Sequence, residues 1–520
     1  MLHLSKTFCR FLASPCTISL TWVPWGYAIL GLLFSLLLFF PGYTRLDAVV
    51  HYTQAVSGVY GDWHPPIIAV IWRGMRYLAN GFTEGTHTGQ GLFFIFQTAL
   101  IWTGVLLCLR TCKKFFSSET KKTWLSLLLF LFLFGWAWIE IVYRSRILFK
   151  DNLFPACFLV AVGCFLNMPK QRWKMMIIAL IAYLLLLLGT ATRHNALFST
   201  WPLLFWLLWT ITPKKSVALV TACSTVLWVV SLGIISYVNY SILNTVRLYP
   251  LQERFYADIF MLNYHTGDFT LPPDTFGNTF GQIDKKTFNA YYNPDVLFVD
   301  LATDGFRKRL SIKLSLVKES VLIEPEDKSK HPFPFAENRF EDHFLKTRFD
   351  NPLSKVDNNN CVFGIIKEKD IRETYPEDYL RLRDAWIEKV SKHWKTYLWI
   401  KANFLRRFLC ANHIFFFFLD GFLLLITSGM IAFVYSLSVR KWNDSKVAVC
   451  MLSWSALLYV MPLLLFLPSD VSDCVRYLYW YFTASLLAIF LMMKDSAFAQ
   501  FLIQNSLKYL RKILLTFPYL

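Results

Sequence analysis

The sequence predicts an α-helical polytopic membrane protein with about ten membrane-spanning helices. Hydrophobic residues make up 55% of the chain and charged residues only 17%, whereas soluble globular domains are roughly 45–50% apolar and about 25% charged. The excess apolar residues form runs of roughly 20 residues, the length that crosses the hydrocarbon core of a bilayer. Short basic clusters recur between these runs, as the positive-inside rule describes.

The apolar runs that we expect to span the membrane follow one another along the chain. The run 65–79 is excluded because it is short, and because Arg73 and Arg76 would each cost about 2.5–3.5 kcal/mol at the centre of a span. We expect 65–79 to lie along the outer membrane surface instead. The predicted spans are 22–40, 91–109, 123–143, 152–167, 175–191, 196–211, 216–238, 412–436, 446–467 and 477–493.

The basic clusters assign each loop to one face of the membrane. With the N-terminus in the cytoplasm, the loops that this topology places inside are the ones that carry Lys and Arg. Counting 65–79 as a span would move all the later clusters outside, so the topology without it is favoured. The clusters comprise Lys113, Lys114, Lys121, Lys122, Lys170, Arg172, Lys174, Lys214, Lys215, Arg440, Lys441 and Lys446.

Four regions follow from this topology. An N-terminal transmembrane region (1–240) includes a long first outer loop (41–90). An extracytoplasmic insertion (241–393), rich in Asp, Asn, Pro and Lys, is expected to have mixed or irregular structure. A C-terminal transmembrane region (394–495) begins with an amphipathic helix whose aromatic residues, Trp394, Tyr397 and Trp399 among them, suit the membrane interface. A basic amphipathic tail (496–520) is expected on the cytoplasmic surface.

Two other classes of protein are disfavoured. The net charge of +18 does not indicate nucleic-acid binding, because the basic residues lie between apolar runs rather than in one solvated patch. The 11 cysteines occur singly, mostly inside apolar runs, with no Cys-x-x-Cys pair and no Cys/His spacing typical of zinc. We expect them to be structural.

The first outer loop contains acids and a histidine that could carry chemistry. Asp47 follows the first span closely, at the membrane surface, where a carboxylate could act as a general base. Asp62 and His64 lie in the segment Gly61-Asp62-Trp63-His64-Pro65-Pro66, whose prolines restrict the backbone beside the imidazole. The alternative for each acid is an ordinary solvated loop residue.

Later outer turns contain cations on the face where positive charge is normally scarce. Together they suit a lipid-linked phosphate, whose tail would lie between helices while Arg and Lys donate charge-assisted hydrogen bonds to the phosphate. A local salt bridge such as Lys150–Asp151, or contact with a lipid headgroup, is the alternative. The residues are Lys150 and Asp151 in one turn, Arg193 and Asn195 in the next, and Arg476 and Tyr477 before the last span.

These segments resemble the polytopic glycosyltransferases of the GT-C type, which take sugar from a polyprenyl-phosphate donor. Relatives include protein O-mannosyltransferases and bacterial enzymes that glycosylate lipid A or surface polysaccharide. The resemblance is carried by Pro41-Gly42-Tyr43 through Asp47, by Asp62-Trp63-His64-Pro65-Pro66, by Lys150-Asp151 and by Arg193-His194-Asn195. It covers residues 41–200 well and 393–490 loosely.

The resemblance implies roles for individual residues. Asp47 matches the catalytic base of the first outer loop, and His64 matches a position that lines the site. Lys150, Arg193 and Arg476 match cations that hold the donor phosphate. Many relatives carry two adjacent acids in the first loop, whereas here Ala48 follows Asp47. We therefore predict no metal. We also expect no cofactor.

The sequence thus favours a GT-C glycosyltransferase of the bacterial inner membrane, with its site facing the periplasm or exterior. Asp47 would deprotonate a polysaccharide, lipid or protein acceptor, and transfer would proceed with inversion. Asp62, His64, Asp151, Asn195 and Tyr477 would line the site. The expected partners are the polyprenyl-phosphate sugar donor, a cell-envelope acceptor and membrane lipids.

Two other functions are compatible with the same residues. A non-enzymatic transporter or flippase for lipid-linked glycans would use the cations to hold a headgroup, but it would also need a polar path across the membrane. A structural assembly subunit would bind a partner through the 241–393 insertion and would leave the outer cations unexplained.

Overall fold

The computed structural model describes a large part of the chain. The predicted span 123–143, Arg476, Tyr477, the tail 496–520 and most of the insertion lie outside the described residues. The described residues are 22–44, 46–62, 64–80, 87–115, 148, 150–212, 216–247, parts of 251–268, 376–411, 421–437, 443–466 and 479–495.

The described part of the chain is helical, with 84% of its residues in helices and no strand. One isolated parallel bridge joins Gly61 to Val246. The helices are α2 (Val23–Phe39), α3 (Leu46–Ser57), α4 (Ile67–Ala79), α5 (Gln90–Phe115), α7 (Lys150–Leu166), α8 (Arg172–Ala191), α9 (Ala196–Ile211), α10 (Val217–Tyr237), the π-helix η1 (Val238–Ile242), α17 (Pro376–Lys392), α18 (Trp394–Ala411), α19 (Gly421–Leu437), α20 (Asp444–Phe466) and α21 (Tyr479–Asp495).

Each apolar run that was predicted to span a membrane coincides at least in part with one of these helices, except 123–143, which is not described. Among the described residues, three helical segments are long and apolar enough to cross a membrane: Gln90–Thr111, Arg172–Ala191 and Val217–Ile242. Shorter apolar helices include Pro24–Phe39 and Ala196–Ile211. The predicted helical, apolar character is therefore confirmed.

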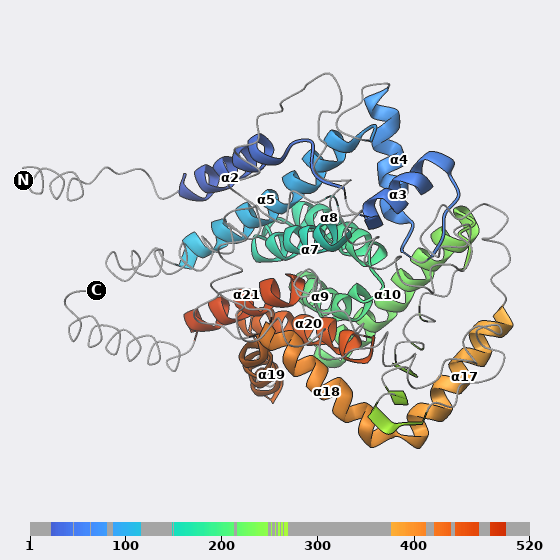
Figure 1. The fold of residues 1–520 in the computed structure, drawn as a ribbon. Coiled ribbons are helices and arrows are strands. Elements are labelled where there is room, and N and C mark those ends of the chain that lie inside the picture. The colour runs from blue at the N-terminus through green and yellow to red at the C-terminus, as the bar shows by residue number, and fades with distance from the viewer. Residues whose placement is uncertain are drawn as a thin grey trace, which may run out of the picture.

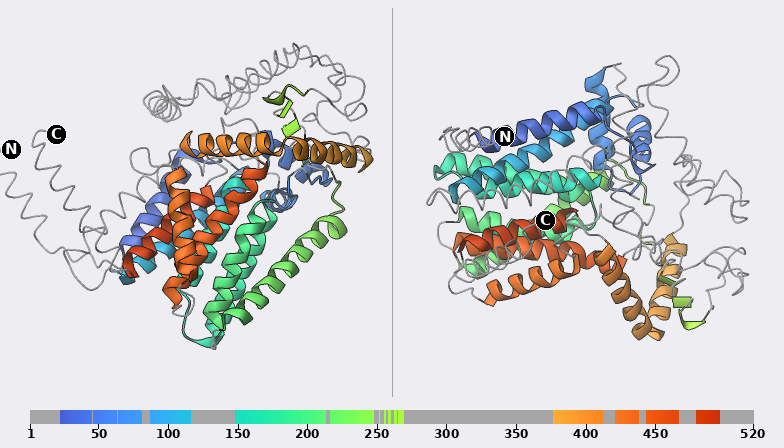
Figure 2. Two further views of the ribbon diagram at one scale, coloured as in Figure 1. Left: turned by 90° about the horizontal axis from the view of Figure 1, so that it is seen from below. Right: turned by 60° about the vertical axis from the view of Figure 1, so that its left-hand side comes forward.

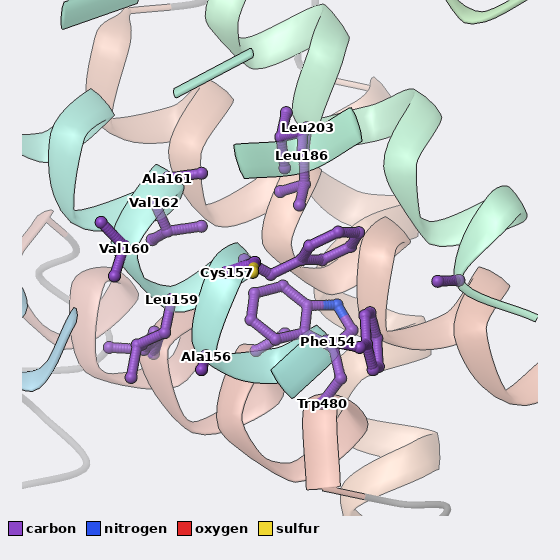
Figure 3. Packing of buried hydrophobic residues seen from close by; sticks show 14 of the residues in the cluster. Phe154, Ala156, Cys157, Leu159, Val160, Ala161, Val162, Leu186, Leu203 and Trp480 are labelled. Carbon is purple, nitrogen blue, oxygen red and sulfur yellow. The ribbon is translucent and has the colours of Figure 1, made fainter. Parts of the chain in front are cut away.

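Helix α7 forms the centre of the bundle (Figure 1). All its residues from Lys150 to Phe165 are buried, as expected for a helix that is apolar on every side. It packs against α5, α8, α9 and α21. Figure 3 shows Phe154 beside Trp480 of α21, with Leu186 of α8 and Leu203 of α9 nearby; the rings of Phe158 and Trp480 meet edge to face at 5.1 Å.

Hydrogen bonds at the helix ends show how the bundle is oriented. Near the end of α2, Gln90 Nε2 donates to the Gly42 carbonyl (2.6 Å), and Leu148 N–H donates to the Tyr43 carbonyl (2.9 Å). The starts of α5 and α7 therefore meet at one end of the bundle. At the other end, Asn167 Nδ2 donates to the Leu107 carbonyl (2.8 Å), so α5 and α7 run parallel.

The remaining helices alternate between these two ends. Helix α9 runs parallel to α7 and ends where Trp209 Nε1 donates to Asp444 at the start of α20 (3.3 Å). Small polar residues join the helices in between, since Ser455 donates to the Ser199 carbonyl (2.7 Å) and Ser428 to Ser485 (2.8 Å). Such hydrogen bonds are typical of helix packing in an apolar environment.

Helices α3 and α4 lie at the end of the bundle where α7 begins (Figure 1). The ring of Tyr52 packs 5.4 Å from that of Trp72, which is fully buried. Arg76 donates to the Ala55 carbonyl (3.2 Å) and lies over the Tyr52 ring. The charge of Arg76 made a span at 65–79 unfavourable. In the structure, this side chain instead joins α4 to α3.

Close packing of α5 on α7 gives a test of this arrangement. A Cβ at Gly104 would lie 2.8 Å from the Leu159 side chain and 3.0 Å from the Val160 backbone nitrogen. We expect Gly104→Leu to destabilise the fold by about 1–3 kcal/mol, because the α7 backbone cannot move aside. Thermal unfolding in detergent measures this effect. Gly233→Leu on α10 is the matched control, since nothing lies within 4 Å of its Cβ position; equal losses in both variants would contradict the packing.

Candidate functional site

Polar side chains that are far apart in the sequence gather where α7 begins and α8 ends. We refer to them as the polar cluster, and they come from α3, the first loop, the start of α7, the α8–α9 turn and η1. The polar cluster comprises His51, Asp62, His64, Lys150, Asp151, Arg193, His194, Asn195 and Tyr240.

The α8–α9 turn is tied to the start of α7 by a buried ion pair. Arg193 and Asp151 form this pair, with side-chain exposures of 8% and 1%. Arg193 Nε also donates to Asn195 Oδ1 within the turn (2.5 Å). The guanidinium is therefore held in one orientation at the end of the bundle.

The first loop reaches the same place through His64. The Nζ of Lys150 lies 2.5 Å from Nδ1 of His64, and the ring of His64 lies 5.2 Å from that of His51 on α3. Lys150 is itself 8% exposed. An ammonium has only donors, so a hydrogen bond from Lys150 requires His64 Nδ1 to act as the acceptor.

The segment after α10 closes over the first loop. Tyr240 donates to the carboxylate of the buried Asp62 (3.0 Å). The backbone reinforces this contact, since Asp62 N–H donates to the Val246 carbonyl (3.0 Å) and Val246 N–H to the Tyr60 carbonyl (2.8 Å). Arg247 lies 4.9 Å from the centre of the Tyr240 ring. Segment 238–247 thus fixes Asp62 relative to the bundle, and its π-helical turn is of a kind often found at functional sites.

His194 joins the α8–α9 turn to the first loop through a hydrogen bond to the Asp62 backbone. The residue as a whole is exposed, but surrounding protein disfavours the charged form of its ring. Burial and the neighbouring charge of Lys150 lower the pKa of His194, while the Asp62 carboxylate and a hydrogen bond to the Asp62 backbone oppose this shift. The hydrogen bond to the backbone carbonyl fixes one ring nitrogen as donor, so the other is an acceptor when the ring is neutral.

Asp47 lies on α3, and its side chain is outside the described part of the structure. Position 47 precedes the buried His51 by four residues, so the two positions share a face of the helix. Because His51 contacts His64, this face of α3 is directed toward the polar cluster. Arg476 and Tyr477 lie outside the described residues; the next described residue is Tyr479, the first of α21.

The structure thus brings together Asp62, His64, Lys150, Asp151, Arg193 and Asn195. It adds three residues that sequence reasoning missed: His51, His194 and Tyr240. His194 lies between Arg193 and Asn195, and His51 follows Asp47 by one helical turn. Both could therefore have been found from their closeness in sequence to predicted site residues. Tyr240 carried none, because 178 residues separate it from Asp62.

The polar cluster combines two buried cations, two buried carboxylates and three imidazoles at the surface end of an apolar bundle. Such a set can hold an anion through Lys150 and Arg193 and can move a proton through a neutral imidazole or a carboxylate. Within the described residues, no group of three or more His, Cys, Asp and Glu is arranged to hold a metal ion.

Comparison with protein-family models, with curated proteins and with solved structures finds no match to this chain.

The buried ion pair predicts a large effect of removing one partner. Asp151→Asn or Arg193→Gln alone should cost about 3–5 kcal/mol, because each leaves the other charge buried without compensation. The double variant should cost much less than the sum of the two. A double-mutant cycle on unfolding in detergent measures the difference, and strictly additive losses would show that the two side chains do not interact.

The lowered pKa of His194 predicts a loss of stability in mild acid. The unfolded chain takes up this proton near pH 6.5, whereas the folded protein takes it up only at lower pH. Stability is therefore complete above about pH 6.5 and falls as the pH drops toward the folded pKa. We expect His194→Gln to flatten the decrease in unfolding temperature between about pH 7.5 and 5; an unchanged pH profile in the variant would assign the effect to other groups.

Proposed function

We propose that this chain is a polytopic membrane glycosyltransferase that transfers a sugar from a polyprenyl-phosphate-linked donor to a cell-envelope acceptor. The observation that carries this proposal is the convergence of Lys150 and Arg193. They come from different helix ends and meet the first loop in one polar cluster. The proposal includes a topology of about ten spans, which is supported by the at least partial overlap of nine of the ten predicted apolar runs with described helices.

The charge at the two ends of the bundle supports an extracytoplasmic site. Helix α8 ends at the polar cluster, so it begins at the opposite end, which we call the basic end. Helices α5 and α7 finish there, and α20 begins there. The positive-inside rule assigns such an end to the cytoplasm, and the polar cluster would then face the periplasm or exterior of a bacterial inner membrane. The described cations near the basic end are Arg110, Lys170, Arg172, Lys174 and Lys446.

The two cations of the polar cluster suit a lipid-linked phosphate. The guanidinium of Arg193 is oriented by Asn195 at Nε and by Asp151 at one terminal nitrogen, and its remaining N–H groups can donate charge-assisted hydrogen bonds to phosphate oxygens. Lys150 adds a compact ammonium at the start of α7. Holding the phosphate as it leaves stabilises the negative charge that develops when the glycosyl bond breaks.

The acceptor would be activated by Asp47. In the proposed reaction the Asp47 carboxylate takes the proton of the acceptor hydroxyl, and the acceptor oxygen attacks the anomeric carbon. The carbon–oxygen bond to the donor phosphate breaks, and the phosphate leaves as an anion beside Lys150 and Arg193. One displacement of this kind inverts the anomeric configuration. The position of Asp47 on the face of α3 shared by His51 supports this role.

Transport of the same lipid-linked glycan is disfavoured by where the buried charges lie. Within the described residues, the buried charged side chains are Asp62, Lys150, Asp151 and Arg193 in the polar cluster, and Asp258, Lys389 and Lys401 outside the bundle. The buried polar residues in the middle of the bundle are mainly small hydroxyls such as Ser453 and Ser455. A route for a charged headgroup through the membrane would call for ionisable groups along its length.

A reconstituted transfer assay tests the proposal. The purified full chain in lipid vesicles would receive radiolabelled polyprenyl-phosphate sugars together with polysaccharide, lipid and protein acceptors. We expect Asp47→Asn to lower turnover by about 10²–10⁴-fold, because the general base is lost. Lys150→Met should raise the KM for donor and also slow turnover. Lys174→Met, at the basic end, is the matched control and should leave transfer unchanged.

Other outcomes would reject parts of the proposal. Transfer that is undiminished in Asp47→Asn would remove Asp47 as the base. Equal effects of Lys150→Met and Lys174→Met would show that Lys150 does not hold the donor phosphate. Movement of labelled glycan across the vesicle membrane without any transfer would replace the transferase with a transporter.

A further inference from the structure

Helices α17 and α18 bury charged side chains and expose large apolar ones. Lys389 and Lys401 are each 7% exposed, whereas Trp394, Leu398 and Trp399 are 54–58% exposed. In water the opposite distribution is expected, because Lys is rarely buried and aromatic side chains are usually covered. We call this pair of helices the platform.

The buried side of the platform is fixed by two carboxylates from segment 255–268. Asp258, which is 2% exposed, accepts hydrogen bonds from Trp386 Nε1 (3.0 Å), Tyr397 Oη (3.0 Å) and Lys401 Nζ (2.6 Å). Burial and the charge of Asp258 raise the pKa of Tyr397. The sequence-based expectation that Tyr397 lies at the membrane interface is therefore wrong: it faces inward.

Asp268 makes the second attachment, at the junction of α17 and α18. Its carboxylate lies 2.9 Å from Lys392 Nζ and 3.0 Å from His393 Nε2, and its carbonyl accepts from Lys389 Nζ (2.8 Å). These contacts fix which side of each helix faces the segment 255–268. The exposed apolar side chains cannot turn inward without breaking them.

Apart from Trp399, whose ring lies 5.5 Å from that of His265 in the same segment, these exposed apolar side chains are not contacted by the two attachments. On α18, Trp394 and Leu398 are four residues apart, so they share a face, whereas Tyr397 and Ile400 are buried. On α17, Leu380 and Ile387 are seven residues apart, so they share one face. The remaining apolar side chains form a stripe along the platform: Leu380, Ile387, Trp394 and Leu398.

The arrangement in space indicates what covers this stripe. Figure 2 (left) shows α17 and α18 lying crosswise over the end of the bundle, with the described parts of segment 255–268 on their far side. The apolar stripe is therefore directed back toward the level at which the bundle helices end. The next described helix, α19, also exposes large apolar side chains, among them Met430, Phe433 and Val434.

We propose that the platform lies on the outer surface of the membrane, with its apolar stripe inserted among the lipid headgroups. Tryptophan is enriched at this depth because its ring is apolar and its N–H is polar. Lys395, which lies 5.7 Å from the centre of the Trp394 ring, is placed to meet lipid phosphates. The proposal depends on the membrane orientation given above, but it does not depend on transferase activity.

Site-specific photocrosslinking tests the platform in the full chain. Benzoylphenylalanine would replace Leu398 or Ile387 in protein reconstituted into vesicles of phosphatidylethanolamine and phosphatidylglycerol. Lys392 is the matched control, because its side chain is exposed but directed to Asp268. We expect illumination to add the mass of a phospholipid at positions 398 and 387, and far less at 392.

Three results would overturn the proposal: no phospholipid adduct at 398 and 387, an adduct to a second protein chain at these positions, or equal lipid labelling at 392. All three positions are exposed, so the variants are expected to fold, and an unfolding temperature close to that of the unmodified chain verifies this. The crosslinking experiment contains no sugar donor. A negative result would therefore reject the membrane contact of the platform without bearing on the proposed glycosyl transfer.

Discussion

The polar cluster depends on one constraint: charged side chains have to be buried beside an apolar helix bundle. Asp151 lies in the first turn of α7, where the helix dipole favours an acid. Lys150 lies one residue earlier, where the same dipole disfavours a cation, and it is nearly as buried. Burying an ion pair contributes little to stability compared with apolar packing. The ion pair joins Asp151 to Arg193, and Lys150 contacts His64; under the proposed function, Lys150 would hold the donor phosphate.

Rigidity around these charges comes from the apolar core. Helix α7 is packed by α5, α8, α9 and α21, so its first turn cannot shift without disturbing the ring contacts of Phe154 (Figure 3) and of Phe158. The segment after α10 then holds the first loop against the cluster through Tyr240 and Val246. The proposed transfer reaction would need such fixed positions, because small displacements of groups that bind a transition state cost much of the rate.

The sequence predicted the helices and part of the site for a simple reason. Apolar runs and basic clusters are local signals, and they locate helix ends, so residues at corresponding ends such as Lys150 and Arg193 could be expected to meet. The contacts of Tyr240 with Asp62 and of Trp386 with Asp258 join distant segments without any local pattern. An amphipathic pattern also does not show which aromatic side chain will hydrogen-bond a buried carboxylate. Tyr397 is an example, because its hydroxyl donates to the buried Asp258.

The platform and the polar cluster lie at the same end of the bundle, and this links the two proposals. A polyprenyl-linked phosphate stays at headgroup depth, because its tail remains in hydrocarbon and its charge in water. Tryptophans at the interface fix the depth of the helices that carry them, and α18 leads into α19 of the same bundle. If the apolar stripe sits among the lipid headgroups, it also fixes the depth of Lys150 and Arg193 relative to those headgroups. Recognition of the donor phosphate would then follow from how the bundle is held in the membrane as much as from the cations themselves.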